Sequence, residues 1–135
     1  MRTIPAAARA ARALERCRAD LAATTVEREF GIRPEFWARF GPNGRTRCLE
    51  DTSFHVTFLV ASLTMGLPSI FSDYVGWLVP MLEARGVGRD DVIENFRVLR
   101  DLVRESFASD EADAVSVLLD AEIERLAPGG SRSVG

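Results

Sequence analysis

The segment from Arg45 to Met65 constrains the fold most, because it runs for about six helical turns without a glycine or a proline. Apolar residues recur along it at helical spacing, and Gly66 and Pro68 follow as termination signals. A strand of this length without a turn would be unusual, although β-branched residues are frequent here. The segment therefore predicts one long central helix. Its expected core stripe is Leu49, Phe54, Phe58, Ala61 and Met65.

Helical spacing continues on the N-terminal side of this segment. Residues 6–23 are rich in alanine and arginine, which favour helices, and their apolar residues recur every three to four positions. Residues 27–40 predict one or two short helical turns, broken at Gly31 and Pro34. Residues 41–44 predict a turn, because they read Gly-Pro-Asn-Gly.

The C-terminal half predicts three more helices. Residues 69–85 are apolar at helical spacing, and a kink or break is expected at Pro80. The next helix begins near Asp90 and reaches about Phe107, and the last helix begins at a Ser109 cap. The expected core faces of these two helices are Val92, Phe96, Leu99 and Val103, and Val115, Leu118, Leu119, Ile123 and Leu126. The predicted fold class is all-α.

The composition suits one folded domain, since 47% of the 135 residues are hydrophobic and 27% are charged. We expect a single domain over residues 1–127 and a disordered C-terminal tail over residues 128–135. The net charge of −3 argues against nucleic-acid binding, which requires an excess of cations. No signal peptide and no membrane span of about 18 apolar residues is visible. The two cysteines fit neither a disulfide nor a zinc site, so we expect a cytoplasmic protein without a bound metal.

Four residues that carry chemistry share one face of the central helix. Cys48, Asp51 and His55 are spaced by three and four positions, and Arg45 lies one turn before them. Each of the four residues can also have an ordinary role in the core or on the surface. When only the spacing is considered, these ordinary roles are favoured over a binding site. Cys48 and His55 are about 10 Å apart along a helix, too far for a nucleophile and its base. No other catalytic motif is present, so we expect no enzymatic activity.

The order of motifs in the middle of the chain resembles that of a known family. Gly44 to Asp51 contains Cys-x-x-Asp at a helix start, followed by Phe54-His55, Gly66, Asp73-Tyr74 and a Gly86-Val87 turn. This arrangement resembles the central region of the phycobiliproteins, the globin-like bilin carriers that include the subunits of allophycocyanin and phycocyanin. The resemblance covers residues 41–107, about half of the chain, and implies a globin-like helical domain.

The resemblance also implies roles for individual residues. Cys48 matches the cysteine that forms a thioether with a bilin, a reaction that requires an accessible thiol or thiolate. Asp51 matches the aspartate that accepts hydrogen bonds from the central pyrrole N–H groups. Arg45 and Arg47 lie where the family has basic residues able to pair with propionates. The residues expected to line the chromophore pocket are Phe54, His55, Tyr74 and Trp77.

Some residues depart from the family pattern and narrow the functional hypothesis. Glu50 stands where an arginine is common, His55 replaces an aromatic residue, and the N-terminal part is shorter. These departures disfavour a light-harvesting antenna. They favour the globins associated with bilin biosynthesis in non-photosynthetic bacteria. The implied function is binding of a linear tetrapyrrole, of biliverdin or phycocyanobilin type, as a carrier, sequestering or sensory protein.

Two other functions remain open at this point. One is a ligand-free, globin-like interaction or regulatory module, a homodimer that buries Leu14 and Leu21 of the N-terminal helix against a partner. The other is a haem-binding globin with His55 as the iron ligand. Haem is the weaker candidate, because the ligand histidine of globins usually lies on the helix after the long central one. The enzymes of bilin biosynthesis are the protein partners that the resemblance suggests.

Overall fold

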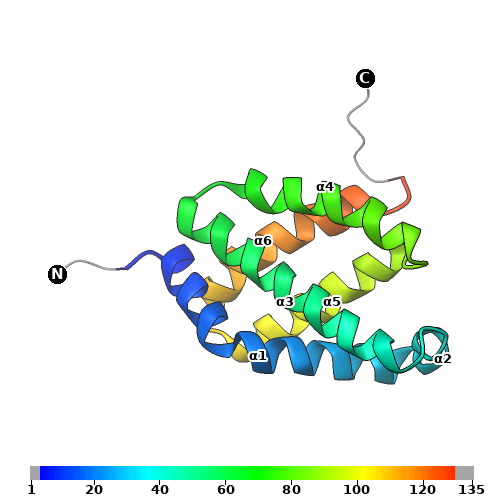
Figure 1. Cartoon of the computed structure of the whole chain (residues 1–135). Coiled ribbons are helices and arrows are strands. Elements are labelled where there is room, and N and C mark those ends of the chain that lie inside the picture. Colours follow the sequence, from blue (N-terminus) through cyan, green and yellow to red (C-terminus); the bar gives the residue numbers. More distant parts are fainter. Residues whose placement is uncertain (1–3, 130–135) are drawn as a thin grey trace.

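The computed structural model describes residues 4–129 and consists of six helices joined by short connections (Figure 1). The helices are α1 (Ala6–Ile32), α2 (Pro34–Ala38), α3 (Pro42–Met65), α4 (Pro68–Ala84), α5 (Arg89–Ser106) and α6 (Ser109–Leu126). No strand occurs within residues 4–129. The all-α prediction is therefore confirmed.

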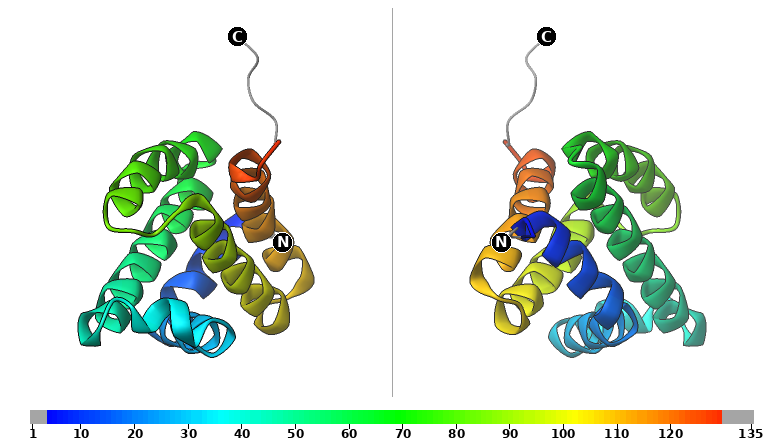
Figure 2. Two further views of the ribbon diagram at one scale, coloured as in Figure 1. Left: turned by 90° about the vertical axis from the view of Figure 1, so that its right-hand side faces the viewer. Right: turned by 90° about the vertical axis from the view of Figure 1, so that its left-hand side faces the viewer.

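The long N-terminal helix connects the two sides of the molecule. α3 and α4 lie on one side, α5 and α6 lie on the other, and α1 packs between them (Figure 2). α1 contacts α3 along much of its length and also contacts both α5 and α6. α2 is short and contacts both α1 and α3.

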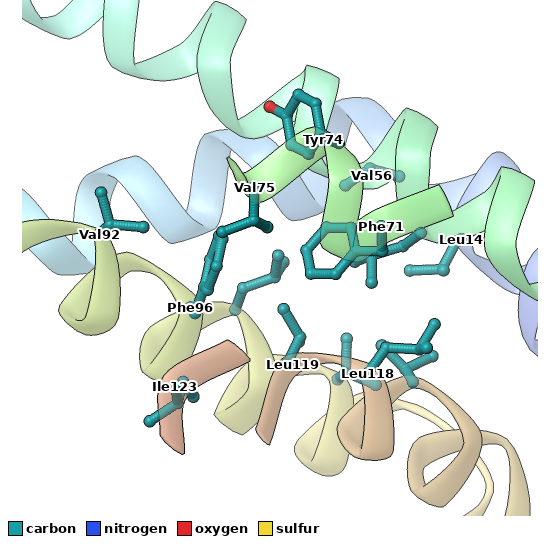
Figure 3. Packing of buried hydrophobic residues seen from close by; sticks show 14 of the residues in the cluster. Leu14, Val56, Phe71, Tyr74, Val75, Val92, Phe96, Leu118, Leu119 and Ile123 are labelled. Atoms are coloured by element: carbon teal, nitrogen blue, oxygen red, sulfur yellow. The ribbon is translucent and has the colours of Figure 1, made fainter. Parts of the chain in front are cut away.

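The hydrophobic core lies where these helices meet. Phe71 of α4 and Phe96 of α5 are fully buried, with their ring centroids 5.6 Å apart, and Leu119 of α6 lies beside them (Figure 3). The predicted core faces of the last two helices are confirmed, because every residue named for them is buried. Leu14 and Leu21 of α1 are also buried in this core, so they are not available to a partner chain.

The predicted core stripe of the central helix is wrong at three of its five residues, while Phe58 is partly buried against the core and Ala61 is half-buried. Leu49, Phe54 and Met65 are exposed by 38%, 57% and 64%. The buried face of α3 is instead Gly44, Cys48, Thr52, His55, Val56, Leu59, Ser62 and Leu63. Apolar residues surround this helix on several sides, so their spacing does not decide which face is buried. The face of α3 that is buried is the one whose polar side chains form hydrogen bonds with residues of other helices.

Two helix boundaries on the N-terminal side also differ from the prediction. α1 continues through Gly31 to Ile32, and Pro34 starts α2 at a position where its missing N–H is no loss. The predicted turn over residues 41–44 is the start of α3. Gly41 has a φ of 69° at the N-cap, and Pro42 begins the helix.

The later helices need smaller corrections. α4 is one continuous helix that contains Pro80, so the expected break is absent. Pro80 is exposed while Val79 and Leu82 are buried, and this packing holds the helix together across the lost hydrogen bond. The N-cap of α6 is Ala108, and Ser109 is its first helical residue.

Two further findings concern the remaining sequence predictions. Within the described residues, no helix is both long and apolar enough to span a bilayer. Residues 128 and 129 form a turn after α6, and the rest of the predicted disordered tail, residues 130–135, lies outside the described residues.

The burial pattern predicts a large difference between two phenylalanines. Phe96→Ala should lower the free energy of unfolding by about 3–5 kcal/mol, because it opens a cavity at a fully buried site. Phe54→Ala, at a side chain exposed by 57%, should change it by less than about 0.5 kcal/mol. Urea denaturation followed by circular dichroism measures both values. Equal losses for the two variants would contradict the packing described here.

Candidate functional site

A cavity of about 360 Å³ lies beside the N-terminal half of α3. Four of the residues predicted for the site line it, namely Arg47, Cys48, Asp51 and His55. Asn43 and Arg47 are exposed at its rim, so the cavity opens to solvent. Its other lining residues are Trp37, Phe40, Gly44, Leu82, Arg85, Val87, Asp91, Val92 and Asn95.

A second hollow, a groove of about 920 Å³, runs between α3 and α4. It contains the three predicted aromatic residues that the cavity lacks, which are Phe54, Tyr74 and Trp77. Its remaining lining residues are Asp51, Phe58, Ile70, Asp73, Leu78, Met81 and Arg85. The structure thus divides the predicted site residues between a cavity, which Arg47, Cys48, Asp51 and His55 line, and a groove, which Phe54, Tyr74 and Trp77 line.

Asp51 and Arg85 line both hollows and form an ion pair between them. Arg85 Nη2 donates to Asp51 Oδ2 at 3.2 Å. Burial raises the pKa of the Asp51 carboxyl group, and the neighbouring guanidinium of Arg85 opposes this shift. The ion pair is therefore the element that links the cavity to the groove.

His55 is buried at the contact between α3 and α4. Its Nδ1 and the Tyr74 hydroxyl form a hydrogen bond of 2.7 Å, and its ring packs edge-on against Phe96. Burial lowers the pKa of His55 to about 3, so the imidazole is neutral near pH 7. One ring nitrogen already has a protein partner, which gives this histidine a clear structural role.

Cys48 belongs to a buried polar cluster that the sequence analysis did not foresee. Its thiol donates to Glu29 Oε2 at 3.6 Å. Asn95 Nδ2 donates to the same carboxylate oxygen at 2.7 Å and to Thr52 Oγ1 at 3.2 Å. Burial is the main cause that raises the pKa of Glu29 to about 7 and the pKa of the Cys48 thiol far above its usual range. The thiol is therefore held in its protonated form.

The sequence does contain a pattern that indicates the burial of Glu29. Leu21, Thr25 and Glu29 are spaced by four positions, so a helix that continues past residue 23 places Glu29 on the buried face. The sequence prediction ended the first helix at residue 23 and therefore missed this continuation. Asn95 is similarly placed on the buried side of α5, one position before Phe96.

Arg45 does not line either hollow. It forms an ion pair with Glu27 of α1, and its guanidinium lies 4.5 Å from the centroid of the Phe30 ring. Residues 4–129 also contain no group of three or more His, Cys, Asp or Glu side chains arranged to hold a metal ion. Of the two arginines predicted to pair with propionates, the structure brings Arg47 to the cavity and keeps Arg45 on the surface of α1 and α3.

Comparison with known proteins finds no family model, no curated protein and no solved structure that matches this chain. The residues themselves therefore carry the functional argument.

The raised pKa of Glu29 predicts a pH-dependent stability. The folded chain keeps a proton on Glu29 that the unfolded chain releases near pH 4.5, so its contribution falls as the pH rises from about 4.5 to about 7. Glu29→Gln cannot ionise and keeps an oxygen that accepts from Asn95. Relative to the wild type, this variant should therefore become more stable across that range and level off above it.

Urea denaturation of both proteins over this pH range measures the difference. His55 acts in the opposite direction, because its lowered pKa makes stability rise with pH between about 3 and 6.5. Both proteins contain His55, so its contribution cancels in the difference. A difference that does not change with pH would show that Glu29 is not a buried, protonated acid.

The protonated, buried thiol predicts that Cys48 reacts slowly. In a Cys17→Ser variant at about pH 8, alkylation by iodoacetamide should be far slower in the folded protein than in denaturant, because the thiolate is the reactive form. Mass spectrometry of timed samples measures the rates. The half-buried Cys17 in a Cys48→Ala variant provides the comparison. Equal rates for folded and unfolded Cys48 would refute its burial.

Proposed function

We propose that this chain has a globin-like fold of the phycobiliprotein type and binds a linear tetrapyrrole without catalysing a reaction. It acts as a carrier, sequestering or sensory protein linked to bilin biosynthesis. The observation that carries this proposal is the position of Asp51, a carboxylate that lines both the cavity and the aromatic groove.

The volumes and lining residues of the two hollows are compatible with a large, mostly apolar ligand. Their volumes, about 360 and 920 Å³, fall within the range of small-molecule sites. In the groove, the rings of Phe58 and Tyr74 are stacked with centroids 4.2 Å apart. Phe54 and Trp77 are exposed by 57% and 62%, and large exposed aromatics beside a groove mark a surface that binds something.

The charges of the site match the polar groups of a bilin. The inner pyrrole N–H groups require an acceptor, and Asp51 supplies a carboxylate between the two hollows. The two propionates require cations, and Arg47 and Arg85 supply guanidinium groups. Because Arg85 is paired with Asp51 in this structure, binding exchanges this ion pair for contacts with the ligand.

The state of Cys48 favours binding without a covalent bond. Thioether formation requires a thiolate that reaches the ligand, whereas this thiol is buried and held protonated beside Glu29. We therefore propose that biliverdin or a phycocyanobilin-type bilin is bound noncovalently, with Cys48 as part of the packing beneath the cavity.

A second function is favoured by one observation. Phe54, Met65, Leu67 and Trp77 are large apolar side chains exposed on α3, on α4 or between them. Such a surface also suits a homodimer or a regulatory interaction module, with a bilin-biosynthesis enzyme as an alternative partner. Leu14 and Leu21, which the sequence analysis expected at a dimer contact, are buried in the core. A dimer would therefore use this exposed apolar surface instead.

An absorption titration with biliverdin and phycocyanobilin tests the proposal. The wild type should show saturable binding and a sharpened red band. Asp51→Asn should weaken binding by about tenfold to a hundredfold, because a charged hydrogen-bond acceptor is lost. Cys48→Ala should bind like the wild type.

The matched control is Asp90→Asn, since Asp90 is exposed and lines neither hollow. It should bind both bilins normally. Spectra identical to those of the free bilins at every ratio would reject the bilin function. A concentration-dependent dimer without bilin binding would then support the interaction module.

A further inference from the structure

The carboxyl group of Glu29 lies directly behind the wall of the cavity. Glu29 is 2% exposed and does not line the cavity, but two residues that do line it bond to its Oε2 atom. The Cys48 thiol donates at 3.6 Å and Asn95 Nδ2 donates at 2.7 Å. Because the cavity is open to solvent, these two side chains lie between the solvent and a buried acid.

An ionised Glu29 has no cation of its own to balance its charge. Within residues 4–129, no arginine forms an ion pair with it. Arg33, one helical turn further along α1, acts on the pKa of Glu29 less than burial does and is itself paired with Asp91 of α5. Glu94 of α5 is negative and raises that pKa. A carboxylate buried without a cation is costly, so ionisation destabilises the closed wall.

The neighbouring helices add no balancing charge. On α3, Arg47 is exposed at the rim of the cavity, and Asp51 belongs to another ion pair. On α2, Glu35 and Arg39 are exposed. Burial therefore dominates, and it raises the pKa of Glu29 to about 7.

We propose that Glu29 is a proton-operated switch in the wall of the cavity. When Glu29 loses its proton, water from the cavity enters between Cys48 and Asn95 and solvates the carboxylate. When the proton returns, the wall closes. The side-chain oxygen of Asn95 is buried without a hydrogen-bond partner, so it offers the entering water a second acceptor. The proposal concerns the chain without a ligand and does not rest on tetrapyrrole binding.

The two states give the cavity different inner walls. In the protonated state the wall is neutral and closed, and in the ionised state it is hydrated and carries a negative charge. Near neutrality, each change of about one pH unit alters the ratio of the two states about tenfold. Small changes of pH therefore alter the charge that the cavity presents.

Hydroxyl-radical footprinting tests the switch, because a microsecond pulse of radicals oxidises the side chains that water reaches. Mass spectrometry then measures the oxidation of both cysteines in one sample. In the wild type, oxidation of Cys48 relative to Cys17 should rise several-fold from about pH 6 to about pH 8, with a midpoint near pH 7. Ionised Glu29 raises the pKa of the Cys48 thiol, so this thiol remains protonated throughout.

Two variants and one direct measurement accompany this experiment. Glu29→Gln cannot ionise, so oxidation of Cys48 should stay low at both pH values. The matched control is Glu124→Gln, since Glu124 is exposed on α6 and lines neither hollow. It should reproduce the pH response of the wild type. A carbon-13 NMR titration of the Glu29 carboxyl carbon reports the ionisation itself and should also have its midpoint near pH 7.

Several outcomes would overturn the switch. Constant oxidation of Cys48 while the Glu29 carboxyl group titrates would mean ionisation without entry of water. An equal rise in Glu29→Gln would mean that another group controls the wall. An equal rise at Cys48 and Cys17 would indicate a general loosening of the fold in place of a local change. A Glu29 carboxyl signal that titrates near pH 4.5, the ordinary value for glutamate, would remove the switch from neutral pH.

Discussion

The polar side chains on the buried face of α3 determine how the other helices are placed. Ser62 accepts the backbone N–H of Phe71, and His55 pairs with Tyr74, so both fix α4. Thr52 and Cys48 share the cluster of Glu29 and Asn95, which joins α3 to α1 and α5. An unpaired polar group in the interior is costly, so these bonds allow few alternative arrangements of the helices. The central helix is therefore oriented by its polar residues as much as by its apolar ones.

This orientation has a direct effect on the surface. With Thr52 and His55 turned inward, Phe54 is turned outward, and it lines the same groove as Trp77 of α4. The same orientation of α3 places Asp51 where it lines both the groove and the cavity. The candidate site thus arises from the partner requirements of the core.

Much of the fold was predictable from the sequence, because apolar residues at helical spacing indicated all the major helices. The core faces of α5 and α6 were also predictable, since their apolar residues form a single stripe opposite a charged face. α3 was different. Its apolar residues lie all around the helix, so the periodicity could not identify the buried face. That choice depends on Glu29, Tyr74 and Asn95, which are distant in the sequence.

The candidate site shows the same limit. The spacing of Cys48, Asp51 and His55 correctly put them on one face of a helix, and the cavity contains all three. Spacing said nothing about their protonation or partners. Burial beside Glu29 raises the pKa of the Cys48 thiol, and burial beside Tyr74 lowers the pKa of His55. These properties come from residues on other helices, so no local pattern could have revealed them.

The ion pair between Asp51 and Arg85 has a thermodynamic consequence. Each of its members lines both hollows, so a molecule that separates the pair in the cavity also changes the charges presented in the groove. The free energies of occupying the two hollows are then coupled, and such coupling is reciprocal. If occupancy of one hollow changes the affinity of the other by some factor, occupancy of the second changes the affinity of the first by the same factor. The ion pair is thus the one contact through which occupancy of either hollow would be felt in the other.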